Sequence, residues 1–392
     1  MNVGHYGMNL GAPGGIARYV ERLGAAQQEA GHTVSYFSSV SPPDDSSLPN
    51  CQTVPAPPAL RAAAQNAGLD VLHLHDPVSL SNWPLPVLRT MHGNHGSCPG
   101  GGRFLAHSGV PCTRTFSPTG CFWHRLTEHC GSRRPGRYWA DVQRTRTEMA
   151  SAESIPTLTV SRFLRNQMER SGVDVHNVQV ILSPAPDVAT DGSPPPRTAP
   201  PRVLFLGRLV PQKGLDWLLE ALAHTETQLH LDVAGEGTLD EYRTLARTLD
   251  VADRVTFHGW VDASRVSALI AQSRAVVFPS MWAEPAGLVT LEAAAHGRAV
   301  IASRAGGIPE YADPSFSLLV PPGDVEALAA RMDLLASDAA LATAMGQRGQ
   351  RYVRRHHGMS TFLAHLSDCY TDAIDAWNSR SASSELAVPQ MS

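Results

Sequence analysis

The chain has 392 residues, too many for one ordinary hydrophobic core, and predicts two domains at roughly 100–200 residues each. Its composition, 43% hydrophobic and 17% charged, is that of a soluble globular protein. The net charge of −4 excludes a global basic field for nucleic acid. No apolar run approaches roughly 18 residues, and the start, MNVGHYGMNLG, lacks the basic and apolar regions of a signal peptide. We therefore expect a cytoplasmic protein without a membrane span.

The first 40 residues predict a strand, a loop, a helix and a second strand. Residues 1–6 form a short apolar run, and the loop NLGAPGG follows. An apolar stripe then recurs at the spacing of one helical face: Ile16, Tyr19, Val20 and Leu23. Gly31 is placed to end this helix, and HTVSYFSS is typical of a strand.

The same pattern restarts at Arg202 with the buried strand VLFLG and the loop RLVPQKG. The next apolar stripe consists of Leu215, Leu218, Leu219 and Leu222. The segments LHLDVAGEG, RVTFHGW, AVVFPS and RAVIAS predict further strands, with a helix from about Gly287. Strands that alternate with helices indicate parallel sheets built from βαβ units.

A segment rich in proline and polar residues, ATDGSPPPRTAPP (189–201), separates the halves and is typical of a linker. We predict two facing, doubly wound α/β domains, whose ligand binds at the carboxyl ends of the strands in the cleft between them. The predicted parts are an N-terminal domain at 1–194 with an insert at 92–139, a linker at 195–201, a C-terminal domain at 202–357, a C-terminal helix at 358–378 that packs on either domain, and a disordered tail at 379–392.

Glycines between the first strand and its helix are candidates for binding an anion. Gly11, Gly14 and Gly15 leave backbone N–H groups accessible at the positive end of a helix, which suits a phosphate. Turn geometry alone explains such glycines equally well, and GAPGG is not the dinucleotide fingerprint. A dehydrogenase would also need an acidic residue after the second strand, where the chain has Ser38 and Ser39.

The loop GRLVPQKG (207–214) carries two cations at the end of a predicted strand. Arg208 offers a planar fork to phosphate oxygens, and Lys213 offers a point charge. A solvated turn is the alternative interpretation. The position at the carboxyl end of a strand favours a role in ligand binding.

The stretch EPAGLVTLEAAAHG (284–297) places two carboxylates eight residues apart. The helix after Gly287 is apolar nearly all round, so we expect Glu292 to point inward and to need a hydrogen-bonding partner. That partner is either an internal threonine or backbone group, or a ligand hydroxyl such as a ribose. Glu284 precedes the helix, so the two acids are not a same-face glycosidase pair. We expect them to grip different parts of one ligand, whose phosphates meet the amides of Gly287 and Leu288.

The segments GGIARYVERL, GRLVPQKG, EPAGLVTLEAAAHG, RAGGIPE and VPPGDVEALA together closely resemble the retaining glycosyltransferases of family 4. The resemblance covers essentially the whole chain, and it is strongest in the carboxyl half. It implies the GT-B fold, which consists of two Rossmann-like domains. It also implies an enzyme of glycan or glycoconjugate biosynthesis that uses a nucleotide-sugar donor.

The resemblance also implies roles for individual residues. Arg208 and Lys213 would hold the donor diphosphate, Glu284 would contact the donor sugar, and Glu292 would bind the ribose hydroxyls. His92, in LRTMHG, matches the histidine of the amino-terminal domain that faces the donor sugar. The nucleotide base would lie near 235–237 and 258–261.

The implied reaction is a hexosyl transfer with retention of configuration by front-face displacement, without a catalytic metal or other cofactor. The acceptor would be a carbohydrate, a lipid-linked molecule or a small molecule. Two alternatives stay open, a non-catalytic binding subunit and a nucleotide-sugar epimerase. The turn at 180–187, VILSPAPD, departs from the asparagine–glycine turn that is frequent in the family.

Four of the six cysteines crowd into the predicted insert: Cys98, Cys112, Cys121 and Cys130. Three arrangements are open for them: a structural zinc or iron–sulfur site, two disulfides, or free buried thiols. The histidines at 95, 107, 124 and 129 could complete a metal site. We favour a metal or paired-thiol staple. Cys51 and Cys369 are most simply small buried hydrophobes.

A local basic patch follows the cysteines: Arg133, Arg134, Arg137, Arg144 and Arg146, with Trp139 nearby. Such a patch is usually a solvated helix face. In an amino-terminal domain it also suits a peripheral contact with the inner membrane face or an anionic, lipid-linked acceptor.

Overall fold

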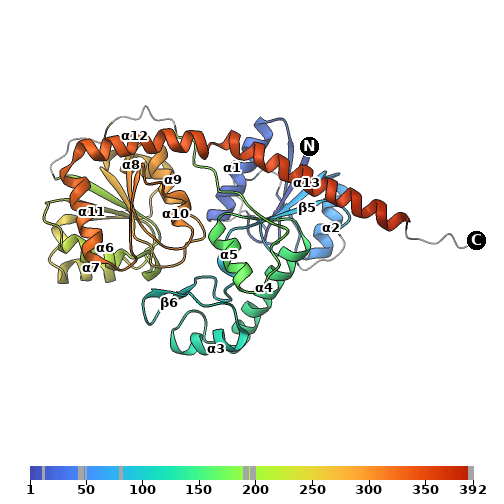
Figure 1. Cartoon of the computed structure of the whole chain (residues 1–392), viewed down its shortest axis with the longest axis horizontal. Helices are drawn as coiled ribbons and strands as arrows, with labels where there is room; N and C mark the ends of the chain where they lie inside the picture. Colours follow the sequence, from blue (N-terminus) through green and yellow to red (C-terminus); the bar gives the residue numbers. More distant parts are fainter. Residues whose placement is uncertain are drawn as a thin grey trace, which may run out of the picture. The chain divides into compact units, whose positions relative to one another are not determined.

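The computed structural model describes residues 1–10, 14–42, 48, 51–78, 83–188, 194 and 200–386, with side chains to Arg380 (Figure 1). The chain divides into two compact units. Unit 1 comprises 1–99, 139–181 and 360–392, and unit 2 comprises 100–138 and 182–359. Most of the predicted linker, 195–199, lies outside the described residues. No helix in the described part of the chain is long and apolar enough to span a bilayer.

Unit 1 is built on a seven-stranded parallel sheet with the strand order β3-β2-β1-β4-β5-β8-β9. Its strands are β1 (Asn2–Gly7), β2 (Thr33–Ser38), β3 (Gln52–Thr53), β4 (Val71–Leu74), β5 (Val87–Met91), β8 (Thr157–Thr159) and β9 (Val178–Val180). Its helices are α1 (Gly15–Glu29), α2 (Pro57–Asn66), η1 (Asn94–Gly96), α4 (Pro135–Ser154), α5 (Arg162–Arg170) and α13 (Met359–Leu386). The strand order reverses between β1 and β4, so the topological switch point lies at the carboxyl ends of these two central strands.

The two faces of this sheet differ in chemistry. An apolar core that includes Leu72 and Leu74 covers one face. On β1 and β4 the alternate residues His5 and His73 lie directly opposite each other in the parallel register. Because α1 packs closely on β2, a Cβ atom at Gly24 would lie 2.0 Å from the Tyr36 hydroxyl.

Unit 2 contains a six-stranded parallel sheet with the order β12-β11-β10-β13-β14-β15. The strands are β10 (Arg202–Leu206), β11 (His230–Ala234), β12 (Val255–Gly259), β13 (Ala275–Phe278), β14 (Ala299–Ser303) and β15 (Ser317–Val320). The helices are η2 (Pro211–Lys213), α6 (Leu215–Ala223), α7 (Leu239–Thr248), η3 (Ala252–Arg254), α8 (Ala263–Gln272), α9 (Leu288–Ala295), α10 (Ile308–Tyr311), α11 (Val325–Ser337) and α12 (Ala339–His356). The insert adds the antiparallel strands β6 (Phe104–Leu105) and β7 (Val110–Pro111), and the helix α3 (Pro118–Thr127).

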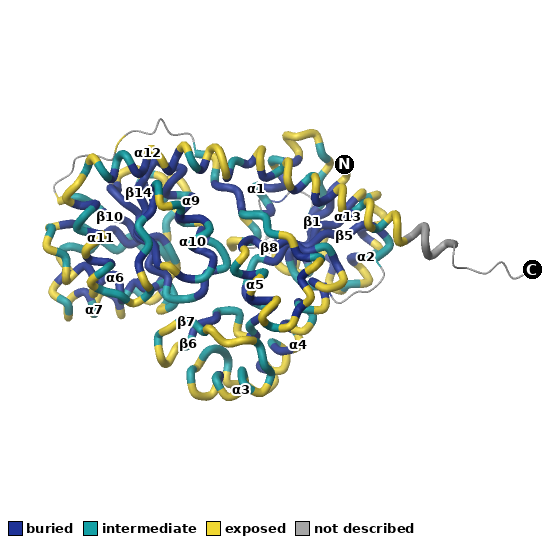
Figure 2. The backbone as a smooth tube through the Cα atoms, in the orientation of Figure 1, coloured by how far each residue is buried: buried dark blue, intermediate teal, exposed yellow. Residues whose placement is uncertain are grey.

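The sheet strands of both units are largely buried (Figure 2). In unit 2 an apolar core lies on each face of the sheet, one against α6 and α11 and the other against α8 and α9. This two-sided burial explains why the strands of the carboxyl half are continuous apolar runs rather than alternating patterns. The predicted α/β class, with two Rossmann-like sheets, is confirmed.

The helix α13 packs on unit 1. Its Tyr370 is buried, and Trp377 donates a hydrogen bond from Nε1 to the carbonyl of Trp83 at 3.2 Å. The helix continues to Leu386, beyond the end expected near residue 378, so the first part of the predicted tail is helical. The remainder, 387–392, lies outside the described residues.

Candidate functional site

The switch point of unit 2 lies between β10 and β13, and the loop after each strand carries predicted site residues. The first loop runs from Gly207 to Gly214 and includes η2, and the second runs from Pro279 to Gly287. Open parallel sheets bind ligands at such a position, outside the carboxyl ends of the strands.

Backbone contacts hold these loops together. The amide of Met281 donates to the carbonyl of Gln212 at 2.8 Å. Gly214 has φ +69°, and a Cβ atom there would lie 2.0 Å from the carbonyl of Pro279. A side chain at this position would therefore force the two loops apart.

A third loop, after β14, fixes the backbone of Glu284. The amide of Gly307 donates to the carbonyl of Glu284 at 2.7 Å. Gly306 has φ +60°, and a Cβ atom there would lie 2.3 Å from the same carbonyl oxygen. A glycine at 306 is therefore needed to position Glu284.

Lys213 and Glu284 form a buried ion pair at the centre of these loops. Lys213 Nζ lies 2.5 Å from Glu284 Oε1, and the side chains are 15% and 7% exposed. Ser280 donates to the same carboxylate oxygen at 2.7 Å. Lys213 Nζ also lies 5.3 Å from the ring centroid of Trp282 and 5.6 Å from that of Phe278. Within the described residues, Glu284 Oε2 has no hydrogen-bond partner, so it can accept a further hydrogen bond.

The other predicted cation of the first loop, Arg208, is exposed. In the described part of the chain, no hydrogen bond or ion pair holds its guanidinium group. Its backbone is fixed next to the loop after β11, because Leu209 donates to the carbonyl of Glu236 at 2.7 Å. A Cβ atom at Gly235 would lie 1.7 Å from the carbonyl of Gly207. The guanidinium group is thus available to a ligand on a rigid support.

The helix α9 begins where the second loop ends. Gly287 is its N-cap, and Thr290 donates to the Gly287 carbonyl from both its amide, at 2.9 Å, and its hydroxyl, at 2.5 Å. Within the described residues, the amides of Gly287, Leu288 and Val289 have no backbone acceptor outside α9. Such N–H groups at the positive end of a helix suit an anion.

Glu292 does not point into the core, and this prediction is wrong. It is half-buried and lies one turn after Leu288, which is 45% exposed. The buried side of α9 is formed by Leu291 and its alanines. An all-apolar helix has almost no amphipathic contrast, so its periodicity could not identify the face left open.

The remaining predicted site residues, His92, Gly14 and Gly15, belong to unit 1. Gly14 is the N-cap of α1, and a Cβ atom at Gly14 or Gly15 would meet no heavy atom within 4 Å. Lack of space for a side chain therefore does not explain why these two positions are glycine. Gly11 lies outside the described residues. His92 directly follows β5, is half-buried, and packs against Tyr19 with ring centroids 4.8 Å apart.

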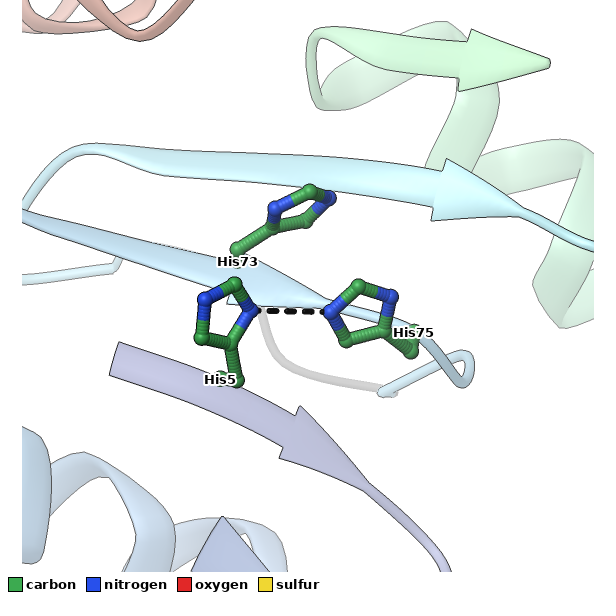
Figure 3. Close-up of side chains that lie close together, drawn as sticks. All are labelled: His5, His73 and His75. Atoms are coloured by element: carbon green, nitrogen blue, oxygen red, sulfur yellow. Dashed lines mark hydrogen bonds between the residues drawn. The ribbon is translucent and has the colours of Figure 1, made fainter. Parts of the chain in front are cut away.

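His92 belongs to a buried cluster that sequence reasoning missed. His5, His73 and His75 have ring nitrogens within 4.8 Å of one another. Figure 3 shows His5 on β1, His73 on the neighbouring β4, and His75 directly after β4. His75 Nδ1 lies 3.0 Å from His92 Nε2. The signal was present in NVGHYG and VLHLH, because histidines at alternate positions of an apolar strand share one buried face.

Burial keeps these imidazoles neutral. It lowers the pKa of His5 to about 4 and the pKa of His92 to about 3. The pKa values of His73 and His75 lie well below the usual range, first because of burial and then because the neighbouring imidazoles disfavour a second charge. The imidazoles at the switch point of unit 1 are thus polar but uncharged.

The clustered cysteines form no disulfide, and the metal staple stays a prediction. All six cysteines lie in the described part of the chain, and none forms a disulfide. The group of three metal-ligating side chains found among the described residues is the histidine cluster, which contains none of Cys98, Cys112, Cys121 and Cys130.

Buried arginines contact the loops of the insert. Arg125, 3% exposed, donates to the carbonyl of Ser132 at 3.2 Å and lies 5.0 Å from the ring centroid of Tyr138. Arg103, 2% exposed, donates to the carbonyl of Arg114 at 2.7 Å. These guanidinium groups satisfy backbone carbonyls of the insert loops.

The basic patch is only partly a solvated face. Arg133, Arg134, Arg137 and Arg146 are exposed, as is Trp139 at 57%. Arg144 is not a surface charge of this kind, because it lies 3.4 Å from Asp76 and 4.0 Å from Glu148.

Two Rossmann-like sheets, each with its switch point lined by polar side chains, define the class of GT-B proteins. Two family models match the chain, "Glycosyltransferase Family 4" over residues 13–186 and "Glycosyl transferases group 1" over residues 190–352. The chain therefore belongs to the glycosyltransferases that these two models describe.

Among curated relatives, the chain is similar to the uncharacterized glycosyltransferase YqgM of Bacillus subtilis. The two are 31% identical over 56% of this chain and 63% of the relative. It is also 36% identical to a GDP-mannose-dependent alpha-(1-6)-phosphatidylinositol monomannoside mannosyltransferase of Mycobacterium tuberculosis, over 43% of this chain and 46% of the relative. The chain thus matches between 46% and 63% of the length of these relatives.

Solved structures share the fold over nearly the full length. Sucrose-phosphate synthase from Thermosynechococcus elongatus has a TM-score of 0.73 at 22% identity, covering 96% of this chain and 99% of its own. HepE of Anabaena, solved in complex with UDP-glucose, has a TM-score of 0.70 at 17% identity, covering 95% and 100%. At these identities the similarity shows the fold alone.

Proposed function

We propose that this chain transfers a hexosyl group from a nucleotide-sugar donor to an acceptor hydroxyl with retention of the anomeric configuration. The observation that carries the proposal is the Lys213–Glu284 pair at the switch point of unit 2, beside the start of α9. Lys213 is the only lysine among the 32 basic residues of the chain. Its ammonium group lies within about 6 Å of the ring centroids of Phe278 and Trp282.

The proposed donor site combines three sources of positive charge. Lys213, the available guanidinium group of Arg208 and the amides of Gly287 and Leu288 would neutralise the diphosphate. The same groups would stabilise the charge that grows on the leaving diphosphate in the transition state. The departing phosphate oxygen would take the proton of the acceptor hydroxyl. In this proposal no step is assigned to a metal ion or to another cofactor.

The two glutamates would contact different parts of the donor. Glu284 would accept a hydrogen bond from a sugar hydroxyl at Oε2, since Lys213 and Ser280 already occupy Oε1. Glu292, on the open face of α9, would accept from the ribose hydroxyls. Half-burial supports this assignment better than the inward position expected from the sequence, because the carboxylate can reach a ligand.

In unit 1, we assign His92 a hydrogen bond to the donor sugar and the glycines at the start of α1 a contact with the acceptor. These assignments rest on the resemblance, supported by the position of both elements at the switch point of the unit 1 sheet. The names of the relatives and neighbours mention GDP-mannose and UDP-glucose, which makes these two compounds the first probes.

The donor site is tested by calorimetry with UDP-glucose and GDP-mannose. Lys213→Met and Arg208→Met should each weaken binding by about 10- to 100-fold, the loss of one charge-assisted contact. Arg351→Met, at an exposed arginine of α12, is the matched control and should bind like the wild type. Failure of the wild type to bind either probe, or equal affinity in all three variants, would refute the donor site. Isomerisation of the donor without an acceptor would identify an epimerase instead.

The insert supports a peripheral contact with an anionic lipid surface, where a lipid-linked acceptor would reside. Phe122, Trp123 and Leu126 of α3 are 38%, 64% and 41% exposed. Exposed arginines follow at 133, 134 and 137. Exposed aromatics beside basic residues are typical of helices that bind at a membrane interface.

Co-sedimentation with phosphatidylcholine vesicles, with and without phosphatidylglycerol, tests this contact. We expect binding only to the anionic vesicles, and we expect the double variant of Trp123→Ala and Leu126→Ala to reduce it at least several-fold. Trp260→Ala, at a tryptophan that is 67% exposed, is the control. Equal binding to neutral and anionic vesicles would contradict the proposal. An equal loss of binding in Trp260→Ala would contradict it as well.

A further inference from the structure

A continuous hydrogen-bonded chain runs through the buried histidines of unit 1. We call it the imidazole relay, and its members are Thr90, His73, Tyr370, Gln27, His5, His75 and His92. The successive distances from Thr90 to His92 are 2.7, 2.8, 3.0, 2.7, 3.0 and 3.0 Å. Within the described residues, the relay stops at His92, whose Nδ1 has no hydrogen-bond partner.

Neutral imidazoles make this chain directional. Each neutral ring has one N–H donor and one bare acceptor nitrogen, so a donor at one end fixes every tautomer along the row. If the amide oxygen of Gln27 accepts from His5 Nε2–H, then His5 Nδ1 must accept from His75 Nε2–H. His75 Nδ1 must in turn accept from His92 Nε2–H. His92 Nδ1 is then a bare acceptor at the open end.

The amide of Gln27 selects between two complete patterns. With the amide reversed, every imidazole would instead carry its proton on Nδ1, and His92 would present a donor. The distance of 2.7 Å between Gln27 and His5 suits an N–H···O bond and is short for an N–H···N bond. The amide nitrogen then donates to Tyr370 at 3.0 Å, and the Tyr370 hydroxyl donates to His73 Nδ1. This pattern satisfies every member between Gln27 and His92.

A metal ion is the other ligand that three clustered histidines suggest, but the ring geometry favours hydrogen bonding. The rings of His73 and His75 are stacked, 4.3 Å apart with 30° between their planes. Lone pairs lie in the ring planes, so stacked rings direct them nearly parallel and not toward one ion. Both nitrogens of His73 are also bonded already, to Tyr370 and to Thr90.

We propose that Gln27, acting through His5 and His75, sets the tautomer of His92 so that its Nδ1 accepts a hydrogen bond from a carbohydrate hydroxyl. Gln27, His5 and His75 are positioning residues, because they act on the ligand only through His92. The proposed contact with carbohydrate rests on the proposed glycosyltransferase function, whereas the tautomer itself does not.

The tautomers are measured by long-range 1H–15N correlation spectra of the histidine side chains in the full chain near pH 7.5. We expect the wild type to carry the proton of His5, His75 and His92 on Nε2. Gln27→Met removes the acceptor, and a buried N–H without an acceptor is the costlier defect, so the three protons should move to Nδ1. Gln27→Glu retains an acceptor for His5 in either protonation state and should restore the wild-type pattern at His92.

Tyr370→Phe is a second test from the other side of Gln27, because it removes the acceptor of the Gln27 amide nitrogen. The amide should then reverse to donate to His5 Nε2, and the protons of His5, His75 and His92 should move to Nδ1, as in Gln27→Met. Nδ1 protonation of His92 in the wild type, or an unchanged tautomer in Gln27→Met with a native-like amide spectrum, overturns the relay. A stoichiometric metal ion in the purified protein, with histidine shifts that a chelator alters, overturns it as well.

The consequence for the ligand is measured by calorimetry with UDP-glucose, GDP-mannose and the nucleotides UDP and GDP. Gln27→Met should weaken the nucleotide sugar by about three- to tenfold, the loss of one hydrogen bond, and leave the nucleotide unchanged. Gln27→Glu should bind like the wild type. An inverted tautomer with unchanged affinity would refute the contact between His92 and the sugar. Absence of any nucleotide binding in the wild type would refute the proposed function instead.

Discussion

Replacing Lys213 by methionine removes the cation from the buried pair at the centre of the unit 2 loops. Glu284 would keep one hydrogen bond, from Ser280 to Oε1, but its charge would have no counterion while its side chain is only 7% exposed. Methionine preserves most of the side-chain volume next to Phe278 and Trp282. The perturbation is therefore largely electrostatic.

The expected cost is large because the pair is desolvated. Removal of one partner from a buried ion pair typically costs about 3–5 kcal/mol. The 15% exposure of Lys213 and the remaining bond from Ser280 place this site at the lower end, about 3 kcal/mol. At about 2–4 °C per kcal/mol for a domain of this size, unit 2 should melt about 6–12 °C lower. The double variant Lys213→Met with Glu284→Gln removes both charges and should recover to within about 1 kcal/mol of the wild type.

The interaction between the two charges is measured by scanning calorimetry of the wild type, the single variants Lys213→Met and Glu284→Gln, and the double variant. The transition that responds to these variants is assigned to unit 2. Arg208→Met is the control for the charge itself: its guanidinium is exposed, so the variant should melt like the wild type and still lose donor affinity. Additive effects of the two single variants would show that the charges do not interact. A wild-type melting temperature for Lys213→Met would likewise show that the Lys213–Glu284 pair does not stabilise unit 2.

Three further outcomes follow from the structure. Gly306→Ala should lower the stability of unit 2 by about 1–3 kcal/mol, because φ is +60° and the new Cβ atom would meet the Glu284 carbonyl. It should also weaken the binding of UDP-glucose or GDP-mannose. A variant with wild-type melting and affinity would contradict this. Acid should destabilise unit 1 as the pH falls from about 6.5 to about 4, since the unfolded chain takes up protons that the folded chain excludes. Burial lowers the pKa of His5 to about 4, so this residue alone should account for about 3 kcal/mol of the lost stability. His5→Gln should therefore flatten the curve of melting temperature against pH. Arg125→Met should expose the insert to chymotrypsin at Phe122 and leave both sheets protected, whereas a resistant insert would show that Arg125 does not hold it.

The sequence predicts the fold well because the apolar periodicity and the glycine loops are local signals. The stripe from Ile16 to Leu23 forms part of α1, and the run VLFLG forms β10 and its turn. The exact end of α13 could not be obtained in this way, since no glycine or proline follows Trp377 until Pro389. The arrangement of the insert depends on Arg103 and Arg125, whose burial no local pattern predicts.

The residues of the candidate site were predicted more completely than their contacts. Lys213 and Glu284 were both expected to hold a ligand, but their mutual bond joins two loops that only the sheet brings together. Glu292 illustrates the opposite error, because a nearly uniform apolar helix has no periodicity from which to read its open face. The imidazole relay was missed because it unites β1, β4, β5, α1 and α13, which are far apart in the sequence.

The same strand order supports different chemistry at the two switch points. In unit 2 it brings together Lys213, Arg208 and the start of α9, which suit an anionic diphosphate. In unit 1 it brings together imidazoles that burial keeps neutral. In the proposed relay a neutral His92 would accept a hydroxyl proton at Nδ1. A charged His92 would present a second donor there instead, so the proposed contact requires the neutral form that burial favours.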